Sequence, residues 1–90
     1  MGKKRDRLEI IADMLRAVQQ KGGEIKPTHL MYKSNLSHNQ MQGYLDDLVG
    51  RDFIKKIKKK QFDYISITDR GHEFLRKLRE MREFEETFGL

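Results

Sequence analysis

The spacing of apolar residues changes twice along this chain of 90 residues, and this constrains the fold more than any other feature. Up to Gly50, apolar side chains recur at the intervals expected for one face of an amphipathic helix. From Phe53 to Ile67, β-branched and aromatic residues predominate, and Ile65-Ser66-Ile67 alternates as a strand does. Helical spacing returns after Thr68. This order predicts helices, then a β-hairpin, then a last helix.

The helical segments carry their own start and stop signals. Asp6 and Glu9 form a capping-box pattern for the first helix, which should end at Gly22-Gly23. The short stretch 24–26 is compatible with a brief strand. A short second helix should follow Pro27, with Thr28 as its N-cap, and Ser37 should cap a third helix from His38 to about Gly50.

The predicted hairpin has strands near 53–57 and 62–67, joined by a lysine-rich connection, and the run 55–60 holds five lysines in six positions. Because that connection contains no Gly or Pro, we expect a turn of more than two residues. A hairpin of this size must pack on the helices to be stable. The last helix should be capped by Thr68 or Asp69, and we expect residues 1–90 to form a single domain ending in a C-terminal helix over 69–90.

The charge of the chain is unevenly distributed. The formal net charge is +5, yet residues 1–62 hold 14 basic and 7 acidic side chains while 63–90 hold 5 basic and 7 acidic. This balance favours nucleic acid or another polyanion as partner. The alternative is that the many Lys and Glu residues reflect adaptation to heat rather than a ligand. There is no cysteine and no long apolar run, so we expect no disulfide, no membrane segment and a cytoplasmic protein.

Three segments resemble a family of small archaeal winged helix-turn-helix proteins, which are predicted transcriptional regulators. They are 27–37 (PTHLMYKSNLS), 45–54 (LDDLVGRDFI) and 64–71 (YISITDRG). The resemblance implies a mainly α fold with a small β-hairpin, a winged helix-turn-helix with an added C-terminal helix. It also implies DNA binding, and some relatives dimerise through a C-terminal coiled coil.

In such a fold the third helix enters the major groove of double-stranded DNA. Its apolar face is taken by Met41, Tyr44, Leu45 and Leu48, so the opposite face is available for contacts. The candidates are Ser37, His38, Asn39, Gln40 and Gln42, preceded by Lys33. Asn39 and Gln42 are the expected base readers, because amides pair bidentately with adenine. However, this helix has no Lys or Arg and carries Asp46 and Asp47, which leaves a merely solvated polar face as the alternative.

The expected phosphate contacts are the lysines of the hairpin, which would form the wing: Lys55, Lys56, Lys58, Lys59 and Lys60. Lysine is a mobile point charge suited to phosphates. A solvated strand edge protected by lysines is the alternative. The basic residues of the N-terminus, Lys3, Lys4, Arg5 and Arg7, are expected to form a frayed, nonspecific arm; an extension of the basic surface is the alternative.

An apolar seam continues along the last helix further than a lone domain requires, through Leu78, Met81, Phe84 and Phe88. We interpret it as a homodimer interface. The alternative is a monomer in which Phe84 and Phe88 fold back on their own core.

No catalytic or cofactor motif is recognisable in the sequence. His29, His38 and His72 lack metal-ligand spacing, and adjacent aspartates on a helix point about 100° apart. We therefore expect no enzyme activity, no cofactor, no metal and no small-molecule substrate. The predicted function is a DNA-binding regulator or chromatin-type protein. A protein-interaction winged helix with no nucleic-acid role is the alternative, and RNA binding is a variant of the first hypothesis.

Overall fold

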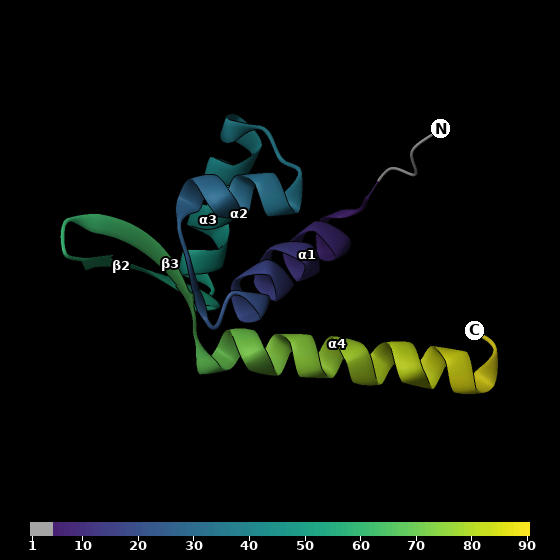
Figure 1. Ribbon diagram of the computed structural model, residues 1–90. Coiled ribbons are helices and arrows are strands. Elements are labelled where there is room, and N and C mark those ends of the chain that lie inside the picture. Colours follow the sequence, from purple (N-terminus) through teal and green to yellow (C-terminus); the bar gives the residue numbers. More distant parts are fainter. Residues whose placement is uncertain (1–4) are drawn as a thin grey trace.

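The computed structural model of the chain describes residues 5–90 and contains four helices and three strands (Figure 1). In chain order these are α1 (Arg7–Gln20), β1 (Glu24–Ile25), α2 (Pro27–Ser34), α3 (His38–Gly50), β2 (Ile54–Lys59), β3 (Phe62–Ile67) and α4 (Asp69–Phe88). The predicted order of helices, hairpin and last helix is confirmed, including the brief strand before α2. Across the described residues, no helix has the length and apolar character needed to cross a bilayer.

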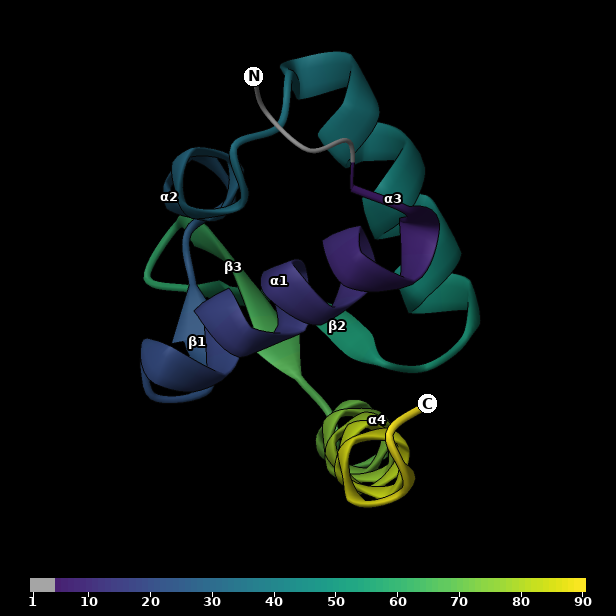
Figure 2. The same cartoon turned by 90° about the vertical axis from the view of Figure 1, so that its right-hand side faces the viewer.

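The core lies where α1, α2 and α3 meet the sheet, and Figure 2 shows these three helices around it with α4 underneath. Leu15 of α1 and Leu48 of α3 are completely buried, with Ile65 of β3 only 2% exposed. Each lies on the apolar stripe that its helix or strand pattern predicts. Packing of these stripes supplies most of the stability of such short helices.

The helix starts follow the sequence signals with one exception. The Asp6–Glu9 capping box forms, and Gly22 and Gly23 both adopt positive φ after α1. Thr28, in contrast, is not an N-cap: α2 starts at Pro27, two residues earlier than a Thr28 cap would place it, with Lys26 in the cap position and no side-chain bond. The reason is Pro27, whose fixed φ suits the first helical position and whose missing N–H is not needed there.

The three strands form an antiparallel sheet in the order β1-β3-β2. The hairpin register runs from Ile54 opposite Ile67 to Lys59 opposite Phe62, which leaves only Lys60 and Gln61 in the turn. The expectation of a longer turn is therefore wrong. Both turn residues adopt positive φ, 48° and 74°, as the tight hairpin turn requires. Side chains other than Gly accept this geometry at a cost of about 1–2 kcal/mol per residue.

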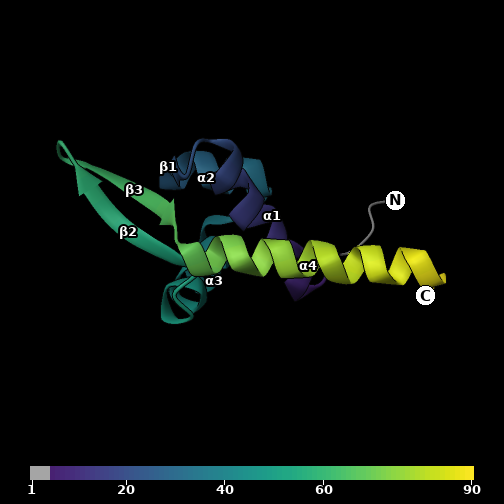
Figure 3. The same cartoon turned by 90° about the horizontal axis from the view of Figure 1, so that it is seen from below.

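The start of α4 is tied tightly to the end of α3. The Thr68 hydroxyl donates to the carbonyl oxygen of Asp52 at 2.6 Å and accepts from the Gly71 N–H at 3.0 Å. Figure 3 shows the result: the hairpin and α4 leave the helical body in opposite directions. The molecule is accordingly elongated, 49 × 33 × 22 Å.

Candidate nucleic-acid interface

The turn between α2 and α3 is short and held from both sides. Asn35 ends α2 in the left-handed conformation with φ 55°, and Leu36 is buried beside it. Arg5 donates to the carbonyl oxygens of Ser34 and Asn35, and it also forms an ion pair with Asp13 at 2.8 Å. Arg5 is therefore a clamp across α1 and this turn rather than part of a frayed arm. Lys3 and Lys4 lie outside the described residues.

Ser37 caps α3, as predicted. Its hydroxyl accepts from the Gln40 N–H at 3.2 Å, while the Gln40 side-chain oxygen accepts from the Ser37 N–H at 2.9 Å. This reciprocal pair commits both side chains to starting the helix. For contacts with DNA, the Ser37 hydroxyl hydrogen and the Gln40 side-chain NH₂ group remain available.

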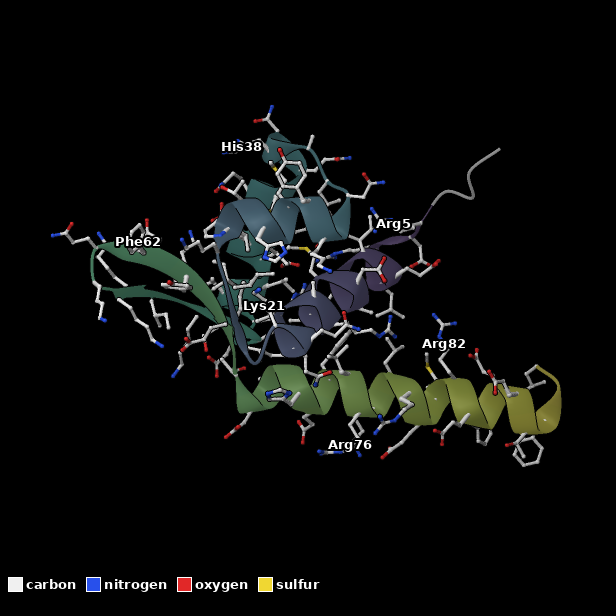
Figure 4. The ribbon with its side chains drawn as sticks, viewed as in Figure 1. Arg5, Lys21, His38, Phe62, Arg76 and Arg82 are labelled. Atoms are coloured by element: carbon white, nitrogen blue, oxygen red, sulfur yellow. The ribbon has the colours of Figure 1, made fainter. Side chains whose placement is uncertain are left out.

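The exposed face of α3 has the composition predicted for it. Met41, Leu45 and Leu48 are buried, Tyr44 is half-buried, and the predicted candidates on the opposite face are all exposed: His38, Asn39, Gln40 and Gln42. Figure 4 labels His38 at the outer end of the helix, far from α4. Lys33 is exposed in the last turn of α2.

The two expected base readers lie on different flanks of this face. Gln42 borders a groove of about 240 Å³ between α3 and the hairpin, which Lys56 and Asp63 also line. Asn39 borders a second groove, of about 290 Å³, which Arg7 of α1 lines on the far side. The polar ridge of α3 thus has a cation on each side.

These cations neutralise the two aspartates of α3. Asp47 accepts from Arg7 at 2.5 Å and from Arg51 at 3.0 Å, while Asp46 lies 4.0 Å from the Lys56 ammonium. The hydrogen bond from Arg7, supported by Arg51, lowers the pKa of Asp47 below the usual aspartate value. The absence of Lys and Arg from α3 is therefore compensated from α1, from the end of α3 and from the hairpin.

Sequence reasoning offered Arg7 only as part of the N-terminal basic cluster, and it did not predict that Arg7 and Arg51 pair with Asp47. Arg51 could have been found, because it follows Asp47 by four residues, a spacing that brings side chains together on a helix. Arg7 could not, because it is 40 residues away from Asp47 in the chain and only the packing of α1 beside α3 brings it close.

The hairpin lysines are divided between the two faces of the sheet. Lys56 and Lys58 share the face of Ile54 and Ile65, whereas Lys55 and Lys59 lie on the other, because side chains alternate along a strand. Lys60 occupies the turn. The wing lysines therefore form two rows rather than one strip.

Three of the five lysines have carboxylates nearby. Lys59 pairs with Glu24 of β1 at 2.5 Å, and that hydrogen bond raises the pKa of Lys59. Lys58 lies 3.9 Å from Asp63, and Lys56 faces Asp46. Among the described residues, only Lys55 and Lys60 of the run have no carboxylate partner. The sequence predicted that all five lysines contact phosphates, but it did not show that three of them have carboxylate neighbours and two do not.

The tip of the hairpin also carries an aromatic ring that the sequence reasoning did not assign to the surface. Phe62 is 55% exposed, and the ammonium of Lys26 lies 4.6 Å from its ring centroid. Lys26 thus adds a cation to the hairpin surface from the segment before α2.

The apolar seam of α4 separates into two parts. Leu78 is only 6% exposed, so it belongs to the core of its own chain, whereas Met81, Phe84 and Phe88 are 43%, 58% and 65% exposed. Phe84 and Phe88 contact each other, with ring centroids 4.9 Å apart, beyond the helical body. The fold-back alternative is wrong for these two rings.

The helix-turn-helix of α2 and α3 with its hairpin wing is the arrangement of a winged helix protein. The winged helix-turn-helix family matches residues 4–86, and the chain belongs to that family. The resemblance seen in the sequence is confirmed.

Two proteins of an archaeon resemble the chain in sequence. The chain is 34% identical over 80 residues to the uncharacterized protein MJ0287 of Methanocaldococcus jannaschii, covering 89% of this chain and 76% of that protein. It is 33% identical over 78 residues to MJ0290 of the same organism, covering 87% of this chain but only 34% of that longer protein.

Solved structures share the fold at lower identity. Sso10a-2, a DNA-binding protein from Sulfolobus solfataricus, superposes with a TM-score of 0.77 at 23% identity, covering 93% of this chain and 85% of that one. F93 from STIV, a winged-helix DNA-binding protein, gives a TM-score of 0.73 at 15% identity, covering 91% and 92%. At these identities the likeness establishes the architecture.

Proposed function

We propose that this protein binds double-stranded DNA as a transcriptional regulator or chromatin-type protein, with α3 in the major groove and the hairpin on the phosphates. One observation carries the proposal: the polar ridge of α3 is exposed and has cations on both flanks, Lys56 of the hairpin and Arg7 of α1. Two proteins with the same fold are described as DNA-binding, which supports it. A regulator must reach the chromosome, so we also propose a cytoplasmic location.

The hairpin would supply most of the sequence-independent affinity. Each phosphate neutralised on duplex DNA contributes about −0.9 to the slope of log K against log salt. Lys55 and Lys60 have no carboxylate partner among the described residues, so they are the first phosphate contacts we expect. Lys59 would contribute less, because contacting DNA would cost it the ion pair with Glu24.

A salt titration with random duplex DNA tests this role. Changing Lys55 and Lys60 to Gln should weaken binding at low salt and make the slope shallower by roughly 2. The control is Lys77→Gln, which removes a charge from α4 outside the hairpin and should leave the slope unchanged; because Lys77 borders the groove of Leu8, Phe74 and Leu78, sedimentation should first show an unchanged oligomeric state. Absence of binding by the native protein at low salt, or equal slopes for all three proteins, would reject the phosphate role of the hairpin.

Base reading is assigned to Asn39 and Gln42. Each can pair bidentately with adenine, and each such contact discriminates by about 1–3 kcal/mol. Asn39→Ala and Gln42→Ala should therefore relax the sequence preference selected from a random library more than they lower affinity for random duplex. Equal losses on all sequences would show that these amides only position the helix.

We propose that the functional unit is a homodimer joined through α4. Met81, Phe84 and Phe88 are large and exposed, and they lie at positions i, i+3 and i+7 in the C-terminal half of α4. They continue into a groove lined by Leu8, Phe74 and Leu78, so a second α4 would find an apolar surface to cover. Dimerisation would also present two α3 ridges to one duplex.

We also propose a binding role rather than catalysis. The adjacent aspartates of α3, Asp46 and Asp47, are engaged with cations of neighbouring elements, an arrangement suited to shaping a surface charge. The second candidate function, a protein-interaction module, is favoured by the apolar end of α4. A native protein that assembles through α4 but does not bind duplex DNA at low salt would support this second candidate.

A further inference from the structure

A groove between α1 and α4 lies apart from both the α3 ridge and the hairpin, and four arginines line it. Its volume is about 420 Å³. From α1 it is lined by Arg16, Gln19 and Gln20, and from α4 by His72, Leu75, Arg76, Arg79 and Arg82. Figure 4 shows Arg76 nearer the hairpin end of α4 and Arg82 further along, so the cations extend over about two turns of the helix.

The carboxylates that pair with these arginines do not line the groove. Arg16 lies 3.6 Å from Asp13, Arg76 lies 3.8 Å from Glu73, and Arg82 lies 3.7 Å from Glu85. All three are exposed pairs three residues apart on one helix, a kind that contributes little energy. Arg79 has no carboxylate partner among residues 5–90. The described groove wall therefore consists of cations and neutral groups, with the partly compensating carboxylates outside it.

The two walls are held together by a polar contact. Gln19 Nε2 lies 2.8 Å from His72 Nδ1, which joins α1 to the first turns of α4. Buried Leu75 forms the apolar part of the wall between them. The arginines are thus carried by two helices in fixed relation, rather than by a flexible loop.

We propose that this groove binds a small multivalent anion, a phosphorylated or polycarboxylate compound. Guanidinium groups donate paired hydrogen bonds that match carboxylate and phosphate oxygens, and such charge-assisted bonds are the strong ones. Arg79 has no carboxylate partner among the described residues, and the exposed pairs of Arg16, Arg76 and Arg82 are weak, so an anion in the groove can draw on all four. The volume lies in the range of small-ligand sites, about 300–1,000 Å³.

The surroundings favour a small anion over a second duplex. α4 carries Glu73 beside the groove and the acidic residues Glu80, Glu83, Glu85 and Glu86 beyond it. An extended phosphate backbone laid along α4 would run past these carboxylates, whereas a small ligand would meet only the groove wall. This placement also separates the anion site from the proposed DNA surface.

Isothermal titration calorimetry of the full chain at low salt tests the proposal with two probes, pyrophosphate and citrate, in separate arms. We expect saturable binding of one anion per chain in at least one arm, and the preferred probe then identifies phosphate or carboxylate chemistry. Arg79→Gln and Arg16→Gln should each weaken binding about tenfold or more, since each removes a charged hydrogen-bond donor. Both side chains are exposed, so circular dichroism should show an unchanged fold.

Lys77→Gln is the matched control. Lys77 lies on the same helix but outside the groove, where it pairs with Glu80 at 3.9 Å, and its loss should leave anion affinity unchanged. The proposal would be overturned by no saturation with either probe, by unchanged affinity in both arginine variants, or by an equal loss in the control. It would also be overturned if Arg79→Gln weakened binding of random duplex as much as the Lys55/Lys60 variant does, because the groove would then be a nucleic-acid surface.

Discussion

At Gly71 a β-carbon would lie 2.4 Å from the carbonyl oxygen of Phe53 and 2.7 Å from Cγ1 of Ile67. The glycine lets the first turn of α4 press against the hairpin base, where its N–H is bonded to Thr68. Neither neighbour can move easily, because the Phe53 carbonyl oxygen accepts from the Thr68 N–H and Ile67 is in the core. The single missing methyl group sets how closely α4 approaches the body.

We predict that Gly71→Ala lowers the free energy of unfolding by about 1–3 kcal/mol, the usual cost of forcing an extra carbon into a packed site. Urea denaturation followed by circular dichroism measures it. Gly43→Ala is the control, because the added methyl would have nothing within 4 Å. It should raise stability by about 1 kcal/mol, as Ala favours a helix interior. A Gly71→Ala variant as stable as the native protein would contradict the close packing.

At the scale of elements, the structure changes how α3 should be viewed. By itself α3 carries two aspartates and no Lys or Arg, so its charge is a poor match for DNA. Packed between α1 and the hairpin, it has Arg7 and Arg51 on Asp47 and Lys56 near Asp46. The charge of the surface therefore depends on how three elements are assembled.

Asp47→Asn tests this assembly through the pH dependence of stability. Because Arg7 lowers the pKa of Asp47 in the fold, the carboxylate contributes stability above the ordinary aspartate pKa of about 3.9. That contribution is lost as the pH falls through the lowered pKa. We predict a lower melting temperature for Asp47→Asn at pH 6, and a difference from the native protein that shrinks below about pH 4.

Asp46→Asn serves as the comparison for this pH experiment, since its partner Lys56 is 4.0 Å away and makes a looser pair. Its effect on the melting temperature at pH 6 should be smaller. A difference between Asp47→Asn and native protein that does not change with pH would mean that the Arg7 contact contributes no ionic stability.

At the scale of the whole molecule, the hairpin and α4 extend in opposite directions from one helical body. The proposed DNA surface and the proposed dimer surface are therefore separated, and neither needs to be disrupted for the other to act. The exposed rings of Phe84 and Phe88 lie beyond the core, so they can be changed without unfolding it.

We predict that the native protein sediments as a dimer at tens of micromolar and that Phe84→Glu with Phe88→Glu makes it a monomer with an unchanged circular dichroism spectrum. Charges placed in an apolar interface without partners oppose association. Analytical ultracentrifugation measures the change. A native protein that is already monomeric at that concentration would reject the α4 interface.

Several features were predictable from local sequence because their physical causes are local. The Asp6 and Ser37 caps, the stops at Gly22-Gly23 and the helical stripes each depend on residues within a few positions of one another. The exception among the caps, Lys26 in place of Thr28, arose where two local signals competed and the fixed φ of Pro27 prevailed. The turn at Lys60-Gln61 was missed because neither residue type favours positive φ, and pairing along the whole hairpin imposed it.

The sequence by itself determined the order of helices and strands, the polar face of α3 and the concentration of lysines on the hairpin, since periodicity and caps are short-range properties. Only the tertiary structure decided which distant charges meet: Arg7 on Asp47, Glu24 on Lys59, and Arg16 of α1 beside the arginines of α4. The physical reason is distance. Ion pairs and grooves form between residues brought together by packing of the core, and their separation in the chain, 40 residues for Arg7 and Asp47, leaves no periodic trace.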